Sequence, residues 1–189
     1  MKKIILSTLF VAALYSCKKE GQKTEGTATT DSLSVTQPAT PEEAGTYIPK
    51  ELSPEKVTEH LAKNNDTLYV TNFFATWCGP CVKEIPSFKS KMDELKGKPV
   101  KFTFVNLDDK AEWNTAVKDF VIKNNLGGSV ILLDGQKLDK NFFTTNFKEW
   151  TGGSIPFTFM RRGDKTDESL GMLTDEALNS KIDSFLKQK

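Results

Sequence analysis

Two cysteines, Cys78 and Cys81, are separated by two residues and lie where a strand-like apolar pattern gives way to a helix-like one. Residues 67–75 are rich in β-branched and aromatic side chains, which predicts a buried strand. Residues 82–95 place apolar side chains three or four positions apart, which predicts an amphipathic helix. These side chains are Val82, Ile85, Phe88, Met92 and Leu95. The cysteines therefore fall at a strand-to-helix junction, and the rest of the fold has to be built around it.

A thiol at the start of a helix is well placed to react. The first turn has N–H groups without partners and a partial positive charge, and both stabilise a thiolate. We expect Cys78 to be the exposed nucleophile and Cys81, about one turn further along and within disulfide distance, to be the shielded resolving thiol. Gly79 leaves the backbone open to a partner, and Pro80 suits a first turn because its missing N–H would have no partner there.

The sequence Trp-Cys-Gly-Pro-Cys at residues 77–81, after an apolar strand, resembles the active site of the thioredoxin family. Residues 81–86 are similar to the C-x-x-E-x-P run of its membrane-tethered bacterial TlpA/ResA-like branch. Cytosolic thioredoxins carry a buried aspartate where this chain has Asn72, so the resemblance implies that Glu84 takes over proton transfer. A solvated helix carboxylate is the alternative interpretation of Glu84. Trp77 is expected to pack beside the site and shape its contact surface.

A proline before a second apolar strand is the other diagnostic element. In the thioredoxin family a cis proline faces the cysteines, and Ile155-Pro156 resembles that position. The resemblance implies that the Ile155 backbone pairs with an extended substrate segment, whereas the alternative is an ordinary proline at the start of a strand. Phe157 stands where the family usually has threonine, so substrate preference is not transferred from relatives.

The rest of the chain alternates between strand and helix periodicity. Further strands are expected at 100–107, 129–134, 157–161 and 168–173, and further helices at 54–63, 111–124 and from Thr174 onward. Helices between strands imply right-handed crossovers and parallel pairing, and the last two strands read as an antiparallel hairpin. This order resembles the thioredoxin-like α/β fold, a central mixed sheet flanked by helices, over about residues 47–189.

The N-terminal third has a different composition. A basic start followed by the apolar residues 4–14 predicts a signal peptide, too short to span a bilayer. Residues 14–17, Leu-Tyr-Ser-Cys, resemble a bacterial lipobox, which implies that Cys17 is acylated; a plain secretory signal with a spare thiol is the alternative. The following residues carry few large apolar side chains. We expect a lipoprotein signal peptide at 1–16, a flexible tether at 17–46 and a thioredoxin-like domain at 47–189.

The cysteine count agrees with this division. With Cys17 acylated, the other two of the three cysteines form one pair. A single pair in an exported chain indicates redox chemistry rather than a fold stabilised by several disulfides. The expected function is a lipid-anchored thiol–disulfide oxidoreductase on the periplasmic side of a bacterial cell envelope. Gly79-Pro80 resembles reducing thioredoxins and favours a protein-disulfide reductase. The expected partners are disulfide-bearing envelope proteins and a membrane electron donor.

Other classes fit less well. A zinc site would need two ligands beyond the cysteine pair, and the chain has one histidine, His60, which a solvated helix position explains; no metal or other cofactor is expected. Thr71 and Ala75 replace the proline and threonine of a peroxiredoxin signature. A net charge of +1 gives no nucleic-acid signature. A non-catalytic thioredoxin-like binding lipoprotein, or a disulfide oxidase or isomerase, are the alternatives kept open.

One aromatic segment has two interpretations. Residues 141–150 contain three phenylalanines and a tryptophan and are expected to form a short helix. Packing of these rings in the core is favoured over a place in a substrate groove.

Overall fold

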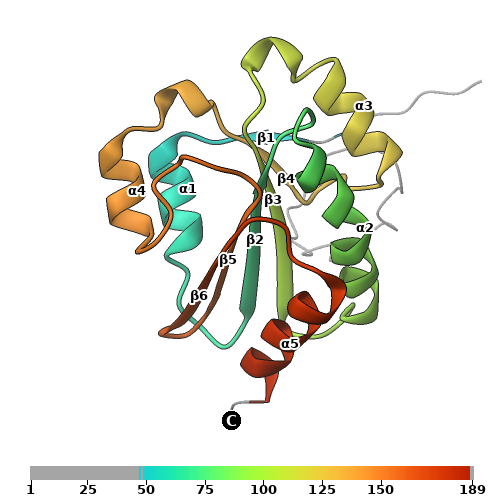
Figure 1. Ribbon diagram of the computed structural model, residues 1–189, viewed down its shortest axis with the longest axis vertical. Helices are drawn as coiled ribbons and strands as arrows, with labels where there is room; N and C mark the ends of the chain where they lie inside the picture. The colour runs from blue at the N-terminus through green and yellow to red at the C-terminus, as the bar shows by residue number, and fades with distance from the viewer. Residues whose placement is uncertain (1–46, 48, 188–189) are drawn as a thin grey trace, which may run out of the picture. The chain divides into compact units, whose positions relative to one another are not determined.

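Strands and helices alternate along the computed structural model, which describes residue 47 and residues 49–187 (Figure 1). The expected signal peptide, Cys17 and the expected tether lie outside the described residues. The strands are β1 (Lys50–Glu51), β2 (Leu68–Phe74), β3 (Val100–Asn106), β4 (Val130–Leu132), β5 (Phe157–Arg162) and β6 (Lys165–Leu170). The helices are α1 (Pro54–Leu61), α2 (Gly79–Glu94), α3 (Ala116–Lys123), α4 (Lys140–Asn146) and α5 (Asp175–Leu186). None of these helices is both long and apolar enough to cross a membrane.

The six strands form one mixed sheet in the order β1-β4-β3-β2-β5-β6. The first four strands in this order, β1, β4, β3 and β2, pair in parallel, while β5 runs antiparallel to both β2 and β6. Strand β2 is central and all seven of its residues are buried. The expected mixed sheet is confirmed, and β2 delivers the cysteine segment to the carboxyl edge of the parallel strands.

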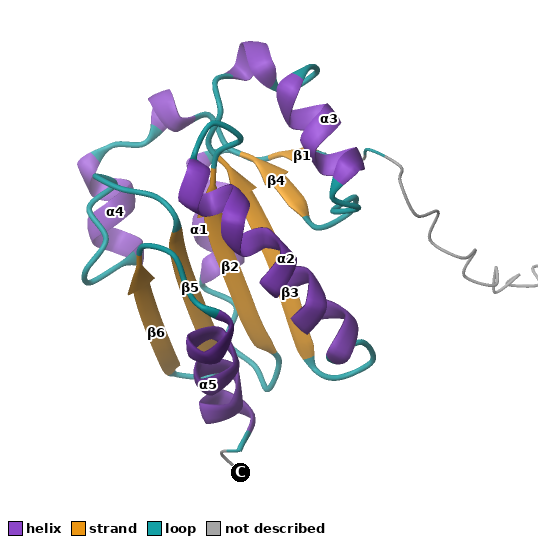
Figure 2. Ribbon diagram, turned by 45° about the vertical axis from the view of Figure 1, so that its right-hand side comes forward, coloured by secondary structure: helices purple, strands orange, loops and turns teal. Residues whose placement is uncertain are grey.

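Helices cover both faces of the sheet. Helices α1 and α4 lie on one face, and α2, α3 and α5 lie on the other (Figures 1 and 2). Because side chains alternate along a strand, β2 serves both layers: Val70 and Phe74 belong to the core under α2, α3 and α5, while Phe73 packs in the core beside α1 and α4. The sheet is therefore buried from both sides around β2.

Several element boundaries differ from the sequence expectation. Strand β1 was not predicted, because two exposed residues show no periodicity. A separate 3-10 turn occupies Lys110–Glu112, so α3 begins only at Ala116. Strand β6 begins at Lys165 rather than residue 168, because the preceding turn needs only Gly163, at φ 56°, and Asp164.

The buried face of α2 is also shifted from the expected one. Cys81, Ile85 and Phe88 have no exposed surface, whereas Val82, which was expected to be buried, is 37% exposed. The helix begins at Gly79, and the stripe that faces the sheet follows the phase of Cys81. The second cysteine thus belongs to the core side of the helix.

Candidate active site around the Cys78–Cys81 disulfide

Cys78 and Cys81 are joined by a disulfide at the start of α2, with their Cα atoms 5.2 Å apart. Cys78 is the N-cap of the helix, and its Sγ accepts a hydrogen bond from the Cys81 backbone N–H at 3.2 Å. Cys78 is 5% exposed and Cys81 is 0% exposed. Cys78 is therefore less open than expected, but it is the cysteine that solvent reaches.

The residues around the cysteines leave the disulfide approachable. Gly79 and Pro80 occupy the first turn of α2 and are exposed, and no atom lies within 4 Å of where a Gly79 Cβ would be. Trp77, directly before the pair, is 72% exposed. An exposed indole of this size beside a disulfide is available for contact with a partner.

The Ile155–Pro156 segment faces the disulfide. Its peptide bond is cis, and the Ile155 carbonyl oxygen lies 3.7 Å from Cys78 Sγ. Pro156 is buried, and its carbonyl oxygen accepts a hydrogen bond from the Gly171 N–H at 2.9 Å. The structure thus brings together two segments that are 77 positions apart, as the resemblance implied.

Glu84 lies one turn beyond Cys81 on α2 and is 1% exposed, so it is not a solvated carboxylate. Its Oε2 accepts a hydrogen bond from the Leu173 N–H at 2.8 Å, and its Oε1 accepts one from Asn72 Nδ2 at 2.8 Å. Burial raises the pKa of Glu84 to about 7, although the two hydrogen bonds favour the carboxylate. The site therefore contains a buried acid that titrates near neutral pH.

Asn72 links this acid to the neighbouring strand. Its Nδ2 also donates to Thr158 Oγ1 on β5 at 3.1 Å, and its Oδ1 is buried without a hydrogen-bond partner. Both Asn72 and Thr158 are at most 1% exposed. The position that resembles the family's buried aspartate is thus occupied by an amide in contact with Glu84.

A second buried carboxylate holds the segment that leads into the cysteines. Asp108, which follows β3, is 1% exposed and accepts hydrogen bonds from the backbone N–H of Thr76 at 2.8 Å and from its hydroxyl. Asn106 Nδ2 donates to the same carboxylate at 2.6 Å. These bonds tie the residue before Trp77 to the end of the neighbouring strand. Sequence reasoning missed Asp108, although its place at the carboxyl end of a parallel strand was a usable signal.

A third carboxylate holds the segment that leads into Ile155. Glu168 on β6 accepts hydrogen bonds from the backbone N–H groups of Lys148 at 2.8 Å, Glu149 at 2.9 Å and Trp150 at 3.2 Å. Trp150 Nε1 in turn donates to the Ser154 carbonyl oxygen at 2.8 Å. No local sequence pattern marks Glu168, because its partners lie 18 to 20 positions away.

The remaining candidate features lie apart from the disulfide. His60 is half-buried on α1, where its ring packs edge-on to Tyr69, and burial lowers its pKa to about 4. Among residues 49–187, no three His, Cys, Asp or Glu side chains gather as a metal-binding group. The aromatic segment 141–150 contributes Phe142, Phe147 and Trp150 to the core, as expected.

Comparisons with known proteins agree with this geometry. The family model described as Redoxin matches residues 43–176. The chain is similar to the sporulation thiol-disulfide oxidoreductase A of Bacillus subtilis (strain 168), at 27% identity over 144 residues, covering 75% of this chain and 79% of that protein. It is also similar to the thiol-disulfide oxidoreductase ResA of Bacillus anthracis, at 26% identity over 146 residues, covering 77% of this chain and 76% of that protein.

Two solved structures bear on the fold. A thioredoxin-related protein from Neisseria meningitidis serogroup B matches with a TM-score of 0.51 and 23% identity, covering 67% of this chain and 90% of that one. A thiol:disulfide interchange protein from Chlorobium tepidum TLS matches with a TM-score of 0.52 and 18% identity, covering 68% and 84%. At these identities the matches confirm the thioredoxin-like fold.

Proposed function

Because this chain belongs to the Redoxin family and is a thiol–disulfide oxidoreductase, we propose that it reduces protein disulfides with Cys78 as nucleophile and Cys81 as resolving thiol. The observation that carries the proposal is the Cys78–Cys81 disulfide at the start of α2, facing the cis Ile155–Pro156 bond. Of the two cysteines, only Cys78 has exposed surface. The Cys81 N–H donates a hydrogen bond to Cys78 Sγ, where it would stabilise a thiolate.

The reaction starts from the reduced pair. The Cys78 thiolate attacks one sulfur of a substrate disulfide; a bond forms between Cys78 and that sulfur, the substrate S–S bond breaks, and the second sulfur leaves and takes a proton from water. Cys81 then loses its proton and attacks Cys78 Sγ. The internal disulfide forms, and the first substrate sulfur leaves as a thiolate and takes a proton from water, so two electrons pass from the pair to the substrate.

Glu84 is proposed to accept the proton that Cys81 loses. Cys81 has no exposed surface, so its proton has to be taken up within the protein, and Glu84 lies on the next turn of the same helix. A carboxyl group with a pKa of about 7 is present in both protonation states near neutral pH, which suits a group that accepts and returns protons.

Location and direction complete the proposal. The apolar residues 4–14 and the lipobox-like sequence ending at Cys17 support an extracytoplasmic protein held by a lipid anchor, and Gly79-Pro80 supports the reducing direction. The substrates would then be disulfide-bearing envelope proteins, with electrons supplied by a membrane donor. A Cys17→Ala chain is expected to leave the membrane fraction and to lose incorporation of labelled fatty acid.

The chemistry is tested by turnover of insulin with dithiothreitol as electron source. Cys78→Ser is expected to abolish turnover, and Cys81→Ser is expected to accumulate a mixed disulfide between Cys78 and the substrate, because no resolving thiol remains. Turnover by Cys78→Ser equal to that of the wild type would contradict the proposal. Titration of the pair in glutathione buffers measures its reduction potential, and a value above that of the glutathione couple would contradict the reducing direction.

A further inference from the structure

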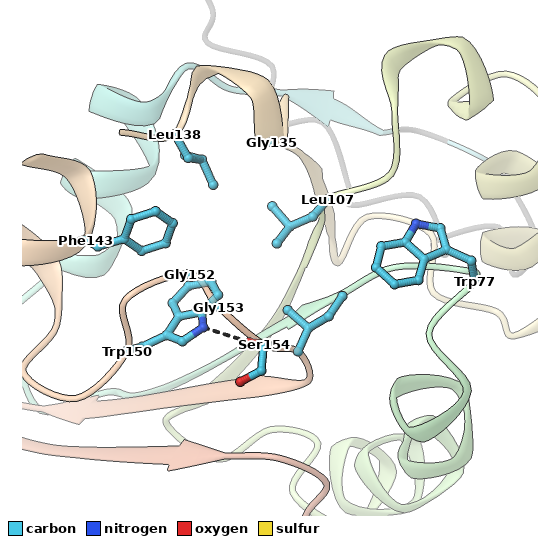
Figure 3. A pocket seen from close by; sticks show the side chains of 10 residues that line it. Trp77, Leu107, Gly135, Leu138, Phe143, Trp150, Gly152, Gly153 and Ser154 are labelled. Carbon is cyan, nitrogen blue, oxygen red and sulfur yellow. Dashed lines mark hydrogen bonds between the residues drawn. The ribbon is translucent and has the colours of Figure 1, made fainter. Parts of the chain in front are cut away.

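An open groove lies between the Trp77 segment and Phe143 of helix α4 (Figure 3). Its volume is about 530 Å3, which is larger than one amino-acid side chain. It is lined by Trp77, Leu107, Gly135, Leu138, Phe143, Trp150, Gly152, Gly153, Ser154 and Ile155. Figure 3 shows Trp77 on one side of the groove, with Leu138 and Phe143 across from it.

Two residues of the groove lining, Trp77 and Ile155, adjoin the reacting sulfur, although neither cysteine lines the groove. Trp77 immediately precedes Cys78, and the Ile155 carbonyl oxygen lies 3.7 Å from Cys78 Sγ. A polypeptide whose cysteine meets Cys78 at this point therefore has neighbouring residues at the mouth of the groove. Extended chain advances about 3.3 Å per residue, so the residues next to the attacked cysteine are the ones that reach it.

The lining selects the chemistry of the occupant. None of the ten lining residues carries a charge; six have aromatic or aliphatic side chains, three are glycines and one is Ser154. Glycines form part of the lining on the Ile155 side, and the Phe143 ring packs so closely over Gly152 that a Cβ there would lie 2.3 Å from Phe143 Cζ. A charged side chain would lose hydration in this groove without gaining a charged partner from its walls, whereas an apolar side chain would lose contact with water at little cost.

The groove is built in advance of any partner. Glu168 holds the backbone of residues 148–150, and Trp150 donates to Ser154. Trp150 also stacks on Phe157, with ring centroids 4.3 Å apart, and packs edge-on against Phe143 at 5.2 Å. A binding surface that is already ordered gives more of its contact energy to affinity, because little side-chain freedom remains to be lost.

We propose that this groove selects substrates by binding a large apolar side chain, aromatic or branched aliphatic, within two residues of the attacked cysteine. The occupant is an extended segment of the disulfide-bearing substrate, which lays its cysteine on Cys78 and its apolar neighbour between Trp77 and Phe143. This inference rests on the proposed function, since it names the substrates of the same reaction. It adds a role for Leu138 and Phe143, which the chemistry of the cysteines does not require.

The test uses short peptides that are symmetrical disulfides and differ only in the residue beside the cysteine: Phe, Leu, Ala or Glu. The reduced full chain transfers two electrons to each peptide disulfide, yielding two peptide thiols and the Cys78–Cys81 disulfide, and chromatography follows both. Each rate is divided by the rate with dithiothreitol, because the neighbour also changes the peptide's own reactivity. We expect the Phe and Leu peptides to react at least ten times faster than the Ala peptide, and the Glu peptide to be slowest.

Two variants change the groove and one serves as a control. Leu138→Glu places a charge on the wall, and Phe143→Ala removes an aromatic wall; both are expected to reduce the Phe-to-Ala preference to less than threefold. Ile122→Glu introduces the same charge at a residue of α3 that is 41% exposed and does not line the groove, and it is expected to retain the full preference. Circular dichroism checks that each variant folds. If Phe143→Ala does not fold, the peptide preference of Leu138→Glu alone decides the test.

The outcomes separate this inference from the proposed function. If the wild type reduces neither insulin nor any peptide, the proposed function is wrong and the groove proposal falls with it. If it reduces all peptides at equal normalised rates, or if the preference persists in Leu138→Glu, the groove proposal is overturned while the function stands. A dimer at the assay concentration that protects Phe143, with no preference among peptides, would assign the groove to a second copy and also overturn the proposal.

Discussion

Asn72 donates a hydrogen bond of 2.8 Å from its Nδ2 to Oε1 of Glu84, joining the central strand β2 to the active-site helix α2. The Oδ1 of the same amide is buried and has no partner. A half-turn of the amide would offer Glu84 an acceptor instead of a donor. Asn72 is therefore suited to both states of the acid, since it donates to the carboxylate and is able to accept from the carboxyl O–H.

Replacing Glu84 with glutamine should change how stability depends on pH. The folded-state pKa of Glu84, about 7, lies above its ordinary value of 4.5, so the folded protein retains this proton where the unfolded chain has lost it. Stability contributed by this group is complete below pH 4.5 and is lost as the pH rises through 7, by up to about 3 kcal/mol. Glu84→Gln should remove this loss and be the more stable protein at pH 8.

Urea unfolding of the oxidised protein at pH 5 and pH 8 measures this effect. Asp93→Asn is the matched control, because it removes one carboxylate from an exposed position of the same helix and should follow the wild type. The prediction is wrong if Glu84→Gln and the wild type lose equal stability between the two pH values.

Replacing Asn72 with aspartate should place two carboxyl groups within hydrogen-bonding distance in a buried site. Two such groups cannot both ionise cheaply, so the pair should hold one proton to higher pH than Glu84 does alone. We expect Asn72→Asp to be destabilised by about 2 kcal/mol or more at pH 8, where the second charge forms, and by less at pH 5. The same urea experiment reports it, and an equal loss at both pH values would contradict the shared proton.

Replacing Glu168 with glutamine should loosen the backbone of residues 148–150. The carboxylate accepts from three N–H groups, and the amide offers one acceptor oxygen with no charge, so we expect a loss of about 1–3 kcal/mol. Amide hydrogen exchange at Lys148, Glu149 and Trp150 should speed up. Glu149→Gln, the same change at an exposed neighbour, is the control and should alter neither quantity. Unchanged exchange in Glu168→Gln would show that other contacts hold this segment.

The local part of the site was predictable because it depends on neighbours in sequence. The strand before Cys78 and the helix after it follow from side-chain periodicity, and the position of Ile155-Pro156 followed from the resemblance. The importance of Asn72 and Glu84 was also inferred from the resemblance; the structure shows both residues buried and in contact, while proton transfer by Glu84 stays a prediction. The Leu173 N–H that completes the Glu84 site was not anticipated, because it comes from a loop 89 positions away.

The parts that were missed depend on how distant segments meet. Glu168 reaches residues 148–150 only in the register that β6 adopts, and the expected start of that strand was three residues too late. The groove depends on the Phe143 ring lying over Gly152, which no pattern in residues 141–153 indicates. Val82 was misplaced because the buried stripe of α2 takes its phase from Cys81, whose burial the periodicity of apolar residues did not include.

The complete burial of Cys81 limits what oxidants and thiol-modifying reagents can do to this pair. In the proposed mechanism a small disulfide such as oxidised glutathione would bond to Cys78, and the Cys81 thiol would remove this adduct before a second glutathione could bond. The chain should therefore return to its closed form after each encounter, and a doubly glutathionylated species should not accumulate. Each molecule of this protein should therefore carry at most one mixed disulfide at a time, even when small disulfides are abundant.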